Sequence, residues 1–227
     1  MSPRRSAPLS SRKEPQQARS ANLVAAVLEA AVQVLAQEGA QRFTTARVAE
    51  KAGVSVGSLY QYFPNKAAIL FRLQSDEWQR TTTLMRGILE DEALPPLARL
   101  RRLVLAFIRS ECEEAEVRTA LADAAPMYRD APEAGEARAT SARAFRVFLK
   151  TVLPEAAGPT RTRAGDLILD TLSGVGKAFS DKPRKPAEIE AYSAAMADMF
   201  CAYLVELGAL PEPAPAARRL RVARKRG

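Results

Sequence analysis

Residues 43–66, FTTARVAEKAGVSVGSLYQYFPNK, constrain this chain more than any other segment. Thr44 is a candidate N-cap for a helix over residues 45–52, because its hydroxyl can accept hydrogen bonds from the free N–H groups of the first turn. Gly53 follows where the chain must leave that helix, since glycine adopts a left-handed backbone at little cost. A second short helix then begins at Ser55. Two short helices joined by a Gly-containing turn predict a helix-turn-helix.

The second helix of this pair has an unusual outer face. It is predicted to run from its cap at Ser55 to about Phe63, with Leu59 and Phe63 directed inward at the i, i+4 spacing. The residues left for the outside are Val56, Gly57, Ser58, Tyr60, Gln61 and Tyr62. Hydroxyls, an amide and a glycine surface suit close approach to a duplex, so we expect this helix to face base edges. The alternative is an ordinary helical hairpin with polar residues in solvent.

The flanking segments support the DNA-binding interpretation. Residues 18–38 form an expected packing helix that ends at Gly39, with apolar residues at helical spacing: Val24, Val27, Leu28, Ala31, Val34 and Leu35. Downstream, Pro64 stops the second short helix and Asn65 can cap the next one, whose first turn contains Lys66. A helix N-terminus beside a cationic side chain attracts anions. This corner is therefore expected to hold a DNA phosphate.

The first seventy residues resemble the tetracycline-repressor (TetR) family of bacterial regulators. The resemblance rests on the "EGA" end of the leading helix, the "FTTARVAEKAGVSVGSLYQYF" core and the "PNK" start of the fourth helix. It implies an all-α protein, in which a three-helix helix-turn-helix domain precedes a helical ligand-binding and dimerisation domain. It also implies a homodimer that binds a double-stranded DNA operator and a small-molecule effector.

The same resemblance assigns roles within the motif. Phosphates are expected at Thr45, Tyr60, Tyr62 and Lys66, and bases at positions 55–58 and Gln61. The full predicted DNA surface is Thr44, Thr45, Arg47, Ser55, Val56, Gly57, Ser58, Tyr60, Gln61, Tyr62 and Lys66. One position departs from the pattern: Ala46 stands where some members of the family use a longer side chain to read a base. Whether Arg47 replaces that contact is open.

The formal charge of +8 is concentrated at the two ends of the chain. Residues 1–20 hold five Arg or Lys against one Glu, and residues 212–227 hold six against one Glu, so the body between them is nearly neutral. A basic arm before the first helix can lie along a minor groove or phosphate ridge, with an affinity that weakens in salt. Alternatively, both tails are solvated and disordered. The expected domains are an arm (1–17), the helix-turn-helix domain (18–65), the effector-binding and dimerisation domain (66–210) and a tail (211–227).

Enzymatic chemistry has little support in the composition. The chain has no histidine, which removes His-based nucleophile pairs and His-ligated zinc, and no Gly-rich phosphate loop occurs. Cys112 and Cys201 are isolated, as expected of small buried thiols in a cytoplasmic protein; a redox-sensing thiol is the alternative. No secretory signal and no run of about 18 apolar residues is apparent. We expect no catalytic residue, cofactor, metal or membrane partner.

Beyond residue 66 the hydrophobic pattern is helical. Helices are expected over residues 66–89, after Pro95 and Pro96, and over about 117–125, 133–152, 160–179 and 186–207. The last two carry apolar stripes, which the resemblance assigns to the dimer interface: Ile168, Leu172, Val175 and Phe179, and Met196, Met199 and Tyr203. The alternative is that these stripes face the core of their own protomer.

The effector pocket is the least constrained expectation. Candidate lining residues are Trp78, Thr82, Met85, Phe107, Glu111, Tyr128, Phe145 and Phe148. A mostly apolar pocket would suit a hydrophobic or aromatic effector, but each of these residues can equally belong to a plain core. The sequence thus predicts a cytoplasmic transcription regulator, a repressor that leaves a palindromic operator when an effector binds. The alternative is an architectural protein that binds DNA without sequence preference.

Overall fold

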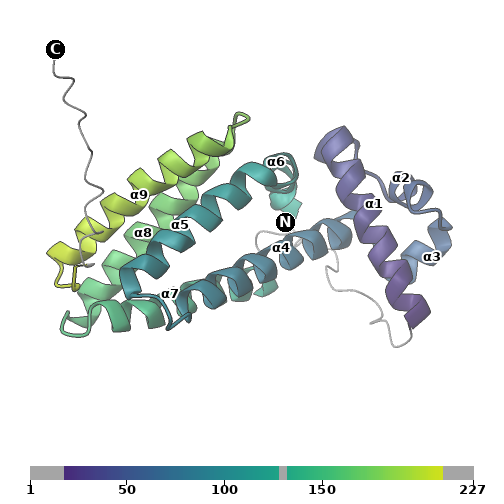
Figure 1. Ribbon diagram of the computed structural model, residues 1–227. Coiled ribbons are helices and arrows are strands. Elements are labelled where there is room, and N and C mark those ends of the chain that lie inside the picture. Colours follow the sequence, from purple (N-terminus) through teal and green to yellow (C-terminus); the bar gives the residue numbers. More distant parts are fainter. Residues whose placement is uncertain (1–17, 128–131, 212–227) are drawn as a thin grey trace, which may run out of the picture.

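The computed structural model describes residues 18–127 and 132–211, in which every regular element is helical and no strand occurs (Figure 1). The all-α expectation is therefore confirmed. The α-helices are α1 (Ala18–Arg42), α2 (Thr45–Lys51), α3 (Val56–Tyr60), α4 (Lys66–Leu89), α5 (Pro96–Glu113), α6 (Ala115–Ala124), α7 (Pro132–Val152), α8 (Gly158–Ser180) and α9 (Pro186–Glu206). A short 3-10 turn, Ala125–Met127, follows α6.

The first hydrophobic core joins α1, α2 and α3 to the first turns of α4. Phe43, Leu59 and Phe63 have no exposed surface and lie at its centre, with Leu35 of α1. The cluster continues through α4 as far as Leu73, beyond the domain boundary expected at residue 65, and it includes residues of α6. Burial of these side chains orients the two short helices, which are too short to be stable alone.

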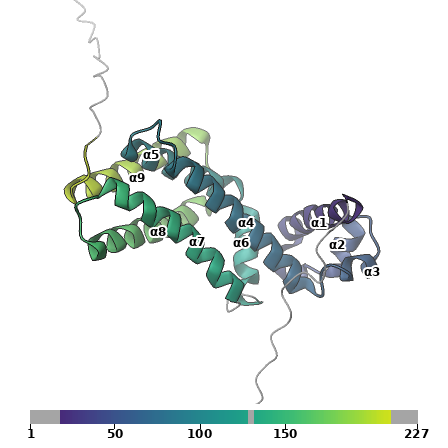
Figure 2. The ribbon, with the colours of Figure 1, turned by 90° about the horizontal axis from the view of Figure 1, so that it is seen from below.

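The second core lies between α5, α7, α8, α9 and the C-terminal half of α4. Phe145, Leu149, Leu100 and Ile108 are fully buried there. α4 runs from one core into the other, as both ribbon views show (Figures 1 and 2). α6 packs on α1 and α4 where the two parts meet. A displacement of α6 or α4 would therefore change the packing of the helix-turn-helix domain.

Two predicted helix ends differ from the structure. α3 ends at Tyr60 and not near Phe63, because Gln61 and Tyr62 form a turn whose N–H groups bond back to Ser58 and Leu59. α1 has non-helical dihedrals at Gly39 (φ 72°, ψ 170°), the predicted end of that helix, and one further turn then continues to Arg42. The positive φ at Gly39 explains why glycine is needed at this kink.

The predicted dimer stripes are partly wrong. Ile168, Leu172 and Met196 are only 0%, 1% and 6% exposed, because α8 and α9 pack against α5 of the same chain. These three residues therefore belong to the protomer core. Of the remaining predicted interface residues, Met199 is exposed, while three are half-buried: Val175, Phe179 and Tyr203.

α1 also has the length and apolar composition of a membrane-crossing helix, with a mean hydropathy of 1.4 over a window within Ser20–Arg42. Three of its apolar residues, Val27, Ala31 and Leu35, are nevertheless fully buried in the first core. Core helices of soluble domains commonly combine this length and composition. We therefore assign the apolar character of α1 to packing within the helix-turn-helix domain.

The close contact between α8 and α5 predicts the effect of adding one methyl group. A Cβ at Gly176 would lie 3.1 Å from Cε1 of Phe107 and 3.3 Å from Cδ1 of Ile108, whereas a Cβ at Gly87 of α4 would meet nothing within 4 Å. We expect overpacking of about 1–3 kcal/mol to oppose the gain in helix propensity at Gly176→Ala, so that its free energy of unfolding is lower than that of Gly87→Ala. Gly87→Ala, the matched control, should raise the free energy of unfolding by roughly 0.5–1 kcal/mol. Urea unfolding measures both, and an equal gain in the two variants would contradict the tight packing.

Candidate nucleic-acid interface and ligand cavity

Side-chain caps set the start of each helix in the helix-turn-helix. The Thr44 hydroxyl accepts from the backbone N–H of Arg47 at 3.3 Å, and the Ser55 hydroxyl accepts from the N–H of Ser58 at 3.0 Å. Gly53, between the two helices, has a φ of 67°. The predicted caps and the left-handed turn are confirmed. They fix the direction in which α3 leaves the turn.

The outer face of α3 carries no charged residue. Val56 and Tyr60 are each 40% exposed, and Gly57 and Gln61 are also exposed. Ser58 is half-buried, and its hydroxyl pairs with that of Ser55 at 2.8 Å. A small, uncharged and partly apolar helix face can approach base edges and thymine methyl groups without displacing an ion.

Tyr62 does not belong to this face. Only 8% of it is exposed, and it is part of the first hydrophobic core. Tyr62 is three residues after the fully buried Leu59, so the two side chains lie on neighbouring parts of the same inward face. The phosphate contact expected of Tyr62 stays a prediction, and only the small exposed part of the residue could make it.

Two predicted phosphate contacts come together across α2 and α3. The hydroxyls of Thr45 and Tyr60 are 3.1 Å apart, with Thr45 half-buried and Tyr60 exposed. One of the two hydroxyls donates to the other, so the pair has one O–H left to donate to an acceptor group. A phosphate oxygen is such an acceptor.

A second anion site is predicted at the start of α4, and its local geometry is present. Asn65 caps the helix by accepting from the N–H of Ala68 at 2.8 Å, and half-buried Lys66 is the first helical residue. The N-terminal N–H groups and the ammonium therefore lie at the same end of a 24-residue helix. That arrangement favours a phosphate.

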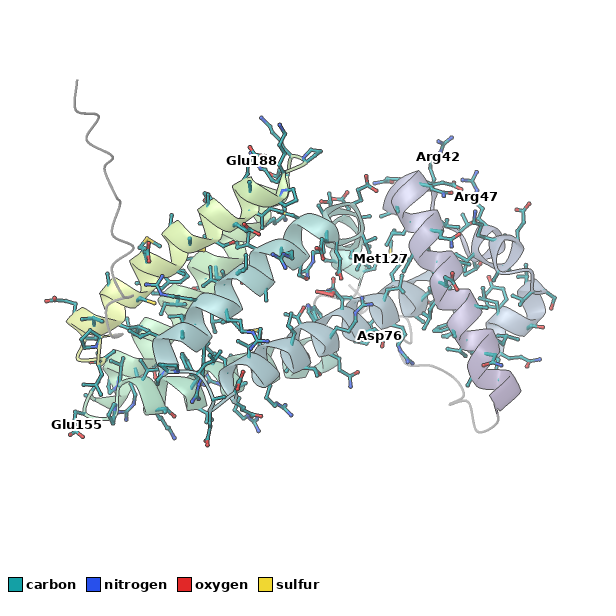
Figure 3. The ribbon with its side chains drawn as sticks, in the orientation of Figure 1. Arg42, Arg47, Asp76, Met127, Glu155 and Glu188 are labelled. Carbon is teal, nitrogen blue, oxygen red and sulfur yellow. The ribbon has the colours of Figure 1, made fainter. Side chains whose placement is uncertain are left out.

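Arg47 of α2 forms an ion pair with a residue of α1. Its guanidinium pairs with the carboxylate of Glu38, which partly compensates its charge. Arg42 and Arg47 project from the same edge of the domain, at the end of α1 and the first turns of α2 (Figure 3). Arg42 is a basic residue of this edge that the sequence analysis did not select. Ala46 is exposed and adds no polar group to the surface.

A cavity of about 180 Å³ lies between α4, α5, α6 and α8. Among its lining residues are Glu77 and Trp78 of α4, Glu111 of α5, Arg118 of α6 and Lys177 of α8. Glu77 and Glu111 are only 4% and 7% exposed. The cavity is thus lined by charged side chains, unlike the mostly apolar pocket expected from the sequence.

Arg118 bridges the two buried carboxylates. Its guanidinium nitrogens lie 2.8 Å from a Glu77 oxygen and 2.5 Å from a Glu111 oxygen, and one of them also donates to the hydroxyl of Ser110 at 2.9 Å. Burial raises the pKa of Glu111 above its usual value of 4.5. Arg118 and, more weakly, Lys177 oppose this rise, while the Glu77 and Glu114 carboxylates add to it.

Comparison with known proteins identifies the family. Residues 27–73 match the family model described as bacterial regulatory proteins of the tetR family, and residues 95–207 match that of the tetracyclin repressor-like C-terminal domain. The chain belongs to the TetR family. It is accordingly a DNA-binding transcriptional regulator built on a helix-turn-helix, and the sequence-based assignment is confirmed.

Three relatives show how far the similarity extends. The nucleoid occlusion factor SlmA of Vibrio campbellii is 38% identical over 84 residues, 36% of this chain and 43% of that protein. The transcriptional regulator TtgR of Pseudomonas putida is 31% identical over 94 residues, 41% and 45% of the two chains. The alignments thus span less than half of these curated relatives. The structure of FadR from Bacillus subtilis in complex with stearoyl-CoA has a TM-score of 0.62 at 16% identity, covering 78% of this chain and 96% of that one.

The predicted effector residues of this TetR-family protein fall into different places. Trp78 and Glu111 line the cavity, whereas Thr82 and Met85 are buried further along α4. Phe107 is half-buried near Gly176, Phe145 and Phe148 belong to the second core, and Tyr128 lies outside the described residues. Phe148 also lines a separate hollow of about 370 Å³ between α4 and α7.

Glu77 and Arg118 are cavity residues that the sequence analysis missed. Glu77 shares a helical phase with Leu70 and Leu73, both buried, so a carboxylate on a buried stripe was the available signal. The same signal selected Glu111. Arg118 lies on a ten-residue helix, whose amphipathic pattern is too short to separate its inner face from its outer one.

The cysteines have no environment that would activate a thiol. Cys201 is buried, and Cys112 is half-buried, with a pKa raised by burial; Arg184 lowers it, while Glu111 and Glu113 raise it further. Redox-sensing thiols require a lowered pKa. Within the described residues no group of three or more metal-ligating side chains occurs.

A substitution at Gly57 can test DNA binding separately from the stability of the fold. It is exposed on α3, and an added Cβ would meet only the Ser55 hydroxyl oxygen, at an unstrained 3.8 Å. Gly57→Ala should therefore keep or raise the free energy of unfolding, by up to about 1 kcal/mol, because alanine favours the helix. Operator affinity should fall, because the new methyl group meets the DNA surface that approaches the glycine. Gly87→Ala is the control, and gel-shift titration with urea unfolding tests both; unchanged operator affinity of the Gly57 variant would remove α3 from the interface.

Proposed function

We propose that this protein is a homodimeric, cytoplasmic repressor that binds a palindromic operator and releases it when a small molecule occupies the cavity. The observation that carries the proposal is the exposed, uncharged face of α3, flanked by the Thr45–Tyr60 hydroxyl pair and the Lys66 corner. Hydroxyl and cationic groups would position the protein on phosphates, and Gly57, Ser58 and Gln61 would meet base edges.

A revised dimer surface follows from the exposed faces of α8 and α9. Leu167 and Met199 are each 52% exposed, and Tyr192 is 37% exposed. Small exposed residues at helical spacing allow close approach along the same faces: Gly174 and Ala178 on α8, and Ala195 and Ala202 on α9. On α8 this face lies one residue away from the predicted stripe at Ile168 and Leu172. A second copy is the occupant that a two-fold operator requires, since each half-site needs its own recognition helix.

The coupling between cavity and DNA would pass through α6. This helix packs on α1, and Arg118 ties it to Glu77 of α4 and Glu111 of α5. A ligand that changes these ion pairs would favour a different placement of α6, α1 and the recognition helix. It would then shift the population away from the operator-binding form by its difference in affinity for the two forms. The FadR structure, solved with stearoyl-CoA, supports ligand binding by this fold.

A second candidate function is suggested by the SlmA relatives, which are named as nucleoid occlusion factors. In that alternative the protein would coat or organise DNA, with the basic segments at both ends adding affinity without sequence preference. Residues 1–17 and 212–227, which contain those segments, lie outside the described residues.

Footprinting on a genomic fragment library separates the two functions. A regulator should protect a short two-fold symmetric site in the presence of excess competitor DNA, with a specific affinity about 10³-fold or more above its non-specific affinity. Continuous protection without a preferred site would reject the repressor proposal and support the architectural alternative.

The dimer surface is tested with Met199→Glu. The variant would place two symmetry-related carboxylates in an apolar interface, where each buried unpaired charge costs several kcal/mol. We expect a folded monomer by sedimentation, with specific operator affinity lost and weak non-specific binding retained.

The matched control is Val147→Glu on α7, because Val147 is also apolar and is 60% exposed but lies outside the proposed surface. It should remain dimeric with intact operator affinity. A Met199→Glu dimer that binds operator as the wild type does would place the interface elsewhere.

A further inference from the structure

The cavity wall contains two buried carboxylates. Two carboxylates, those of Glu77 and Glu111, are more than nine-tenths buried at its wall, and both pair with the guanidinium of Arg118. Glu77 also accepts from the Thr81 hydroxyl and lies 3.9 Å from the exposed guanidinium of Arg80.

A third carboxylate, that of Glu114, lies 3.7 Å from Nε of Arg118 and is 40% exposed. Lys177 contributes one cationic group at the rim, where it is exposed. A buried carboxylate is costly unless its charge is compensated, so a cation that pairs with either carboxylate is stabilised at this wall.

One hydrogen-bond donor of Arg118 has no partner in the described part of the chain. Its two terminal nitrogens bond to the carboxylates and to Ser110, but Nε is buried and has no hydrogen-bond partner among the described residues. Leaving a buried donor unpaired costs free energy. A ligand that pairs with one of the carboxylates would therefore compete with a guanidinium whose Nε is already unpaired.

Size and shape restrict the ligand further. At about 180 Å³ the cavity is smaller than the range of roughly 300–1,000 Å³ that is usual for drug-sized ligands. Trp78 forms part of the wall beside Glu77, and the face of an indole ring attracts cations. A small, flat cation would combine contact with the ring and hydrogen bonds to a carboxylate.

We propose that the cavity between α4, α5, α6 and α8 binds a small organic cation, an amine or amidine, which bonds to Glu77 and Glu111 in competition with Arg118. The inference rests on the proposed function only in taking this cavity as the effector site. Loss of the Arg118 bridges would loosen α6 from α4 and α5, and α6 packs on α1 of the DNA-binding part. The cation would thereby act as the releasing ligand.

Proton release accompanies the binding. Burial and the Glu77 and Glu114 carboxylates raise the pKa of Glu111, against the opposing effect of Arg118 and Lys177, so Glu111 keeps its proton to a higher pH than an ordinary glutamate does. A bound cation favours the ionised form. Its affinity should consequently increase as pH rises through the raised pKa of Glu111 and should level off above it.

The experiment uses three flat probes of nearly the same shape: benzamidine, a cation; benzamide, which is neutral; and benzoate, an anion. Trp78 is the only tryptophan of the chain, so intrinsic tryptophan fluorescence reports on this cavity. We expect saturable fluorescence change and thermal stabilisation of the full-length protein with benzamidine, and neither with benzamide nor with benzoate.

Three isosteric variants assign the effect to the carboxylates. Glu111→Gln and Glu77→Gln should each weaken benzamidine binding by about tenfold or more, because they remove a charge-assisted hydrogen bond. Glu111→Gln should also abolish the pH dependence described above. Glu90→Gln, an exposed position at the end of α4, should change neither. Thermal unfolding verifies that all three variants are folded before they are titrated.

The outcomes separate the ligand class from the proposed function. The inference is wrong if benzamidine gives no saturable change, if benzoate or benzamide binds as well, or if the Glu111 and Glu77 variants bind benzamidine like the wild type. Selective benzamidine binding that leaves operator affinity unchanged would uphold the cation site and reject its role in releasing DNA. A specific operator with no benzamidine binding would uphold the regulator and reject the cation.

Discussion

The placement of α6 depends on the buried bridge from Arg118 to Glu77 and Glu111. It connects α6 to α4 and α5, and α6 in turn packs on α1 of the helix-turn-helix. Breaking a buried ion pair by removing one partner is far more costly than the pair is stabilising, because the remaining charge is left uncompensated. The bridge therefore acts as a specific constraint on helix placement more than as a source of stability. Only another charged group can replace one of its members at low cost.

α4 links the two hydrophobic cores. Its first turns are part of the core that supports the recognition helix, and its last turns are part of the core that contains α5, α7, α8 and α9. A packed helix transmits displacement because cores tolerate only discrete arrangements. The cavity lies beside the middle of α4, at Glu77 and Trp78. A ligand there would contact α4, which contributes described residues to both cores.

The sequence predicted those features of the structure that depend on only a few neighbouring residues. The caps at Thr44, Ser55 and Asn65 and the left-handed glycine at Gly53 were predictable, because each depends on a side chain or a dihedral within a few residues. The end of α3 was not predictable, since residues 61–63 satisfy a helical pattern although Gln61 and Tyr62 form a turn. The phase of α8 was ambiguous for a different reason: periodicity reveals an apolar stripe but not whether its neighbour is the same chain or a second copy. Burial of Ile168 and Leu172 against α5 decides that question.

The short length of α3 has an evolutionary consequence. A helix of five residues has no independent stability, so its conformation is supplied by the Ser55 cap, by the burial of Leu59 and by the turn that follows Tyr60. The exposed side chains at Val56 and Gln61 and the bare backbone at Gly57 take no part in that support. Residues that maintain the helix are thus separate from those available to meet DNA. In the proposed regulator, substitutions at the second group would change the preferred operator without a penalty in folding, so new binding specificities would arise on an unchanged scaffold.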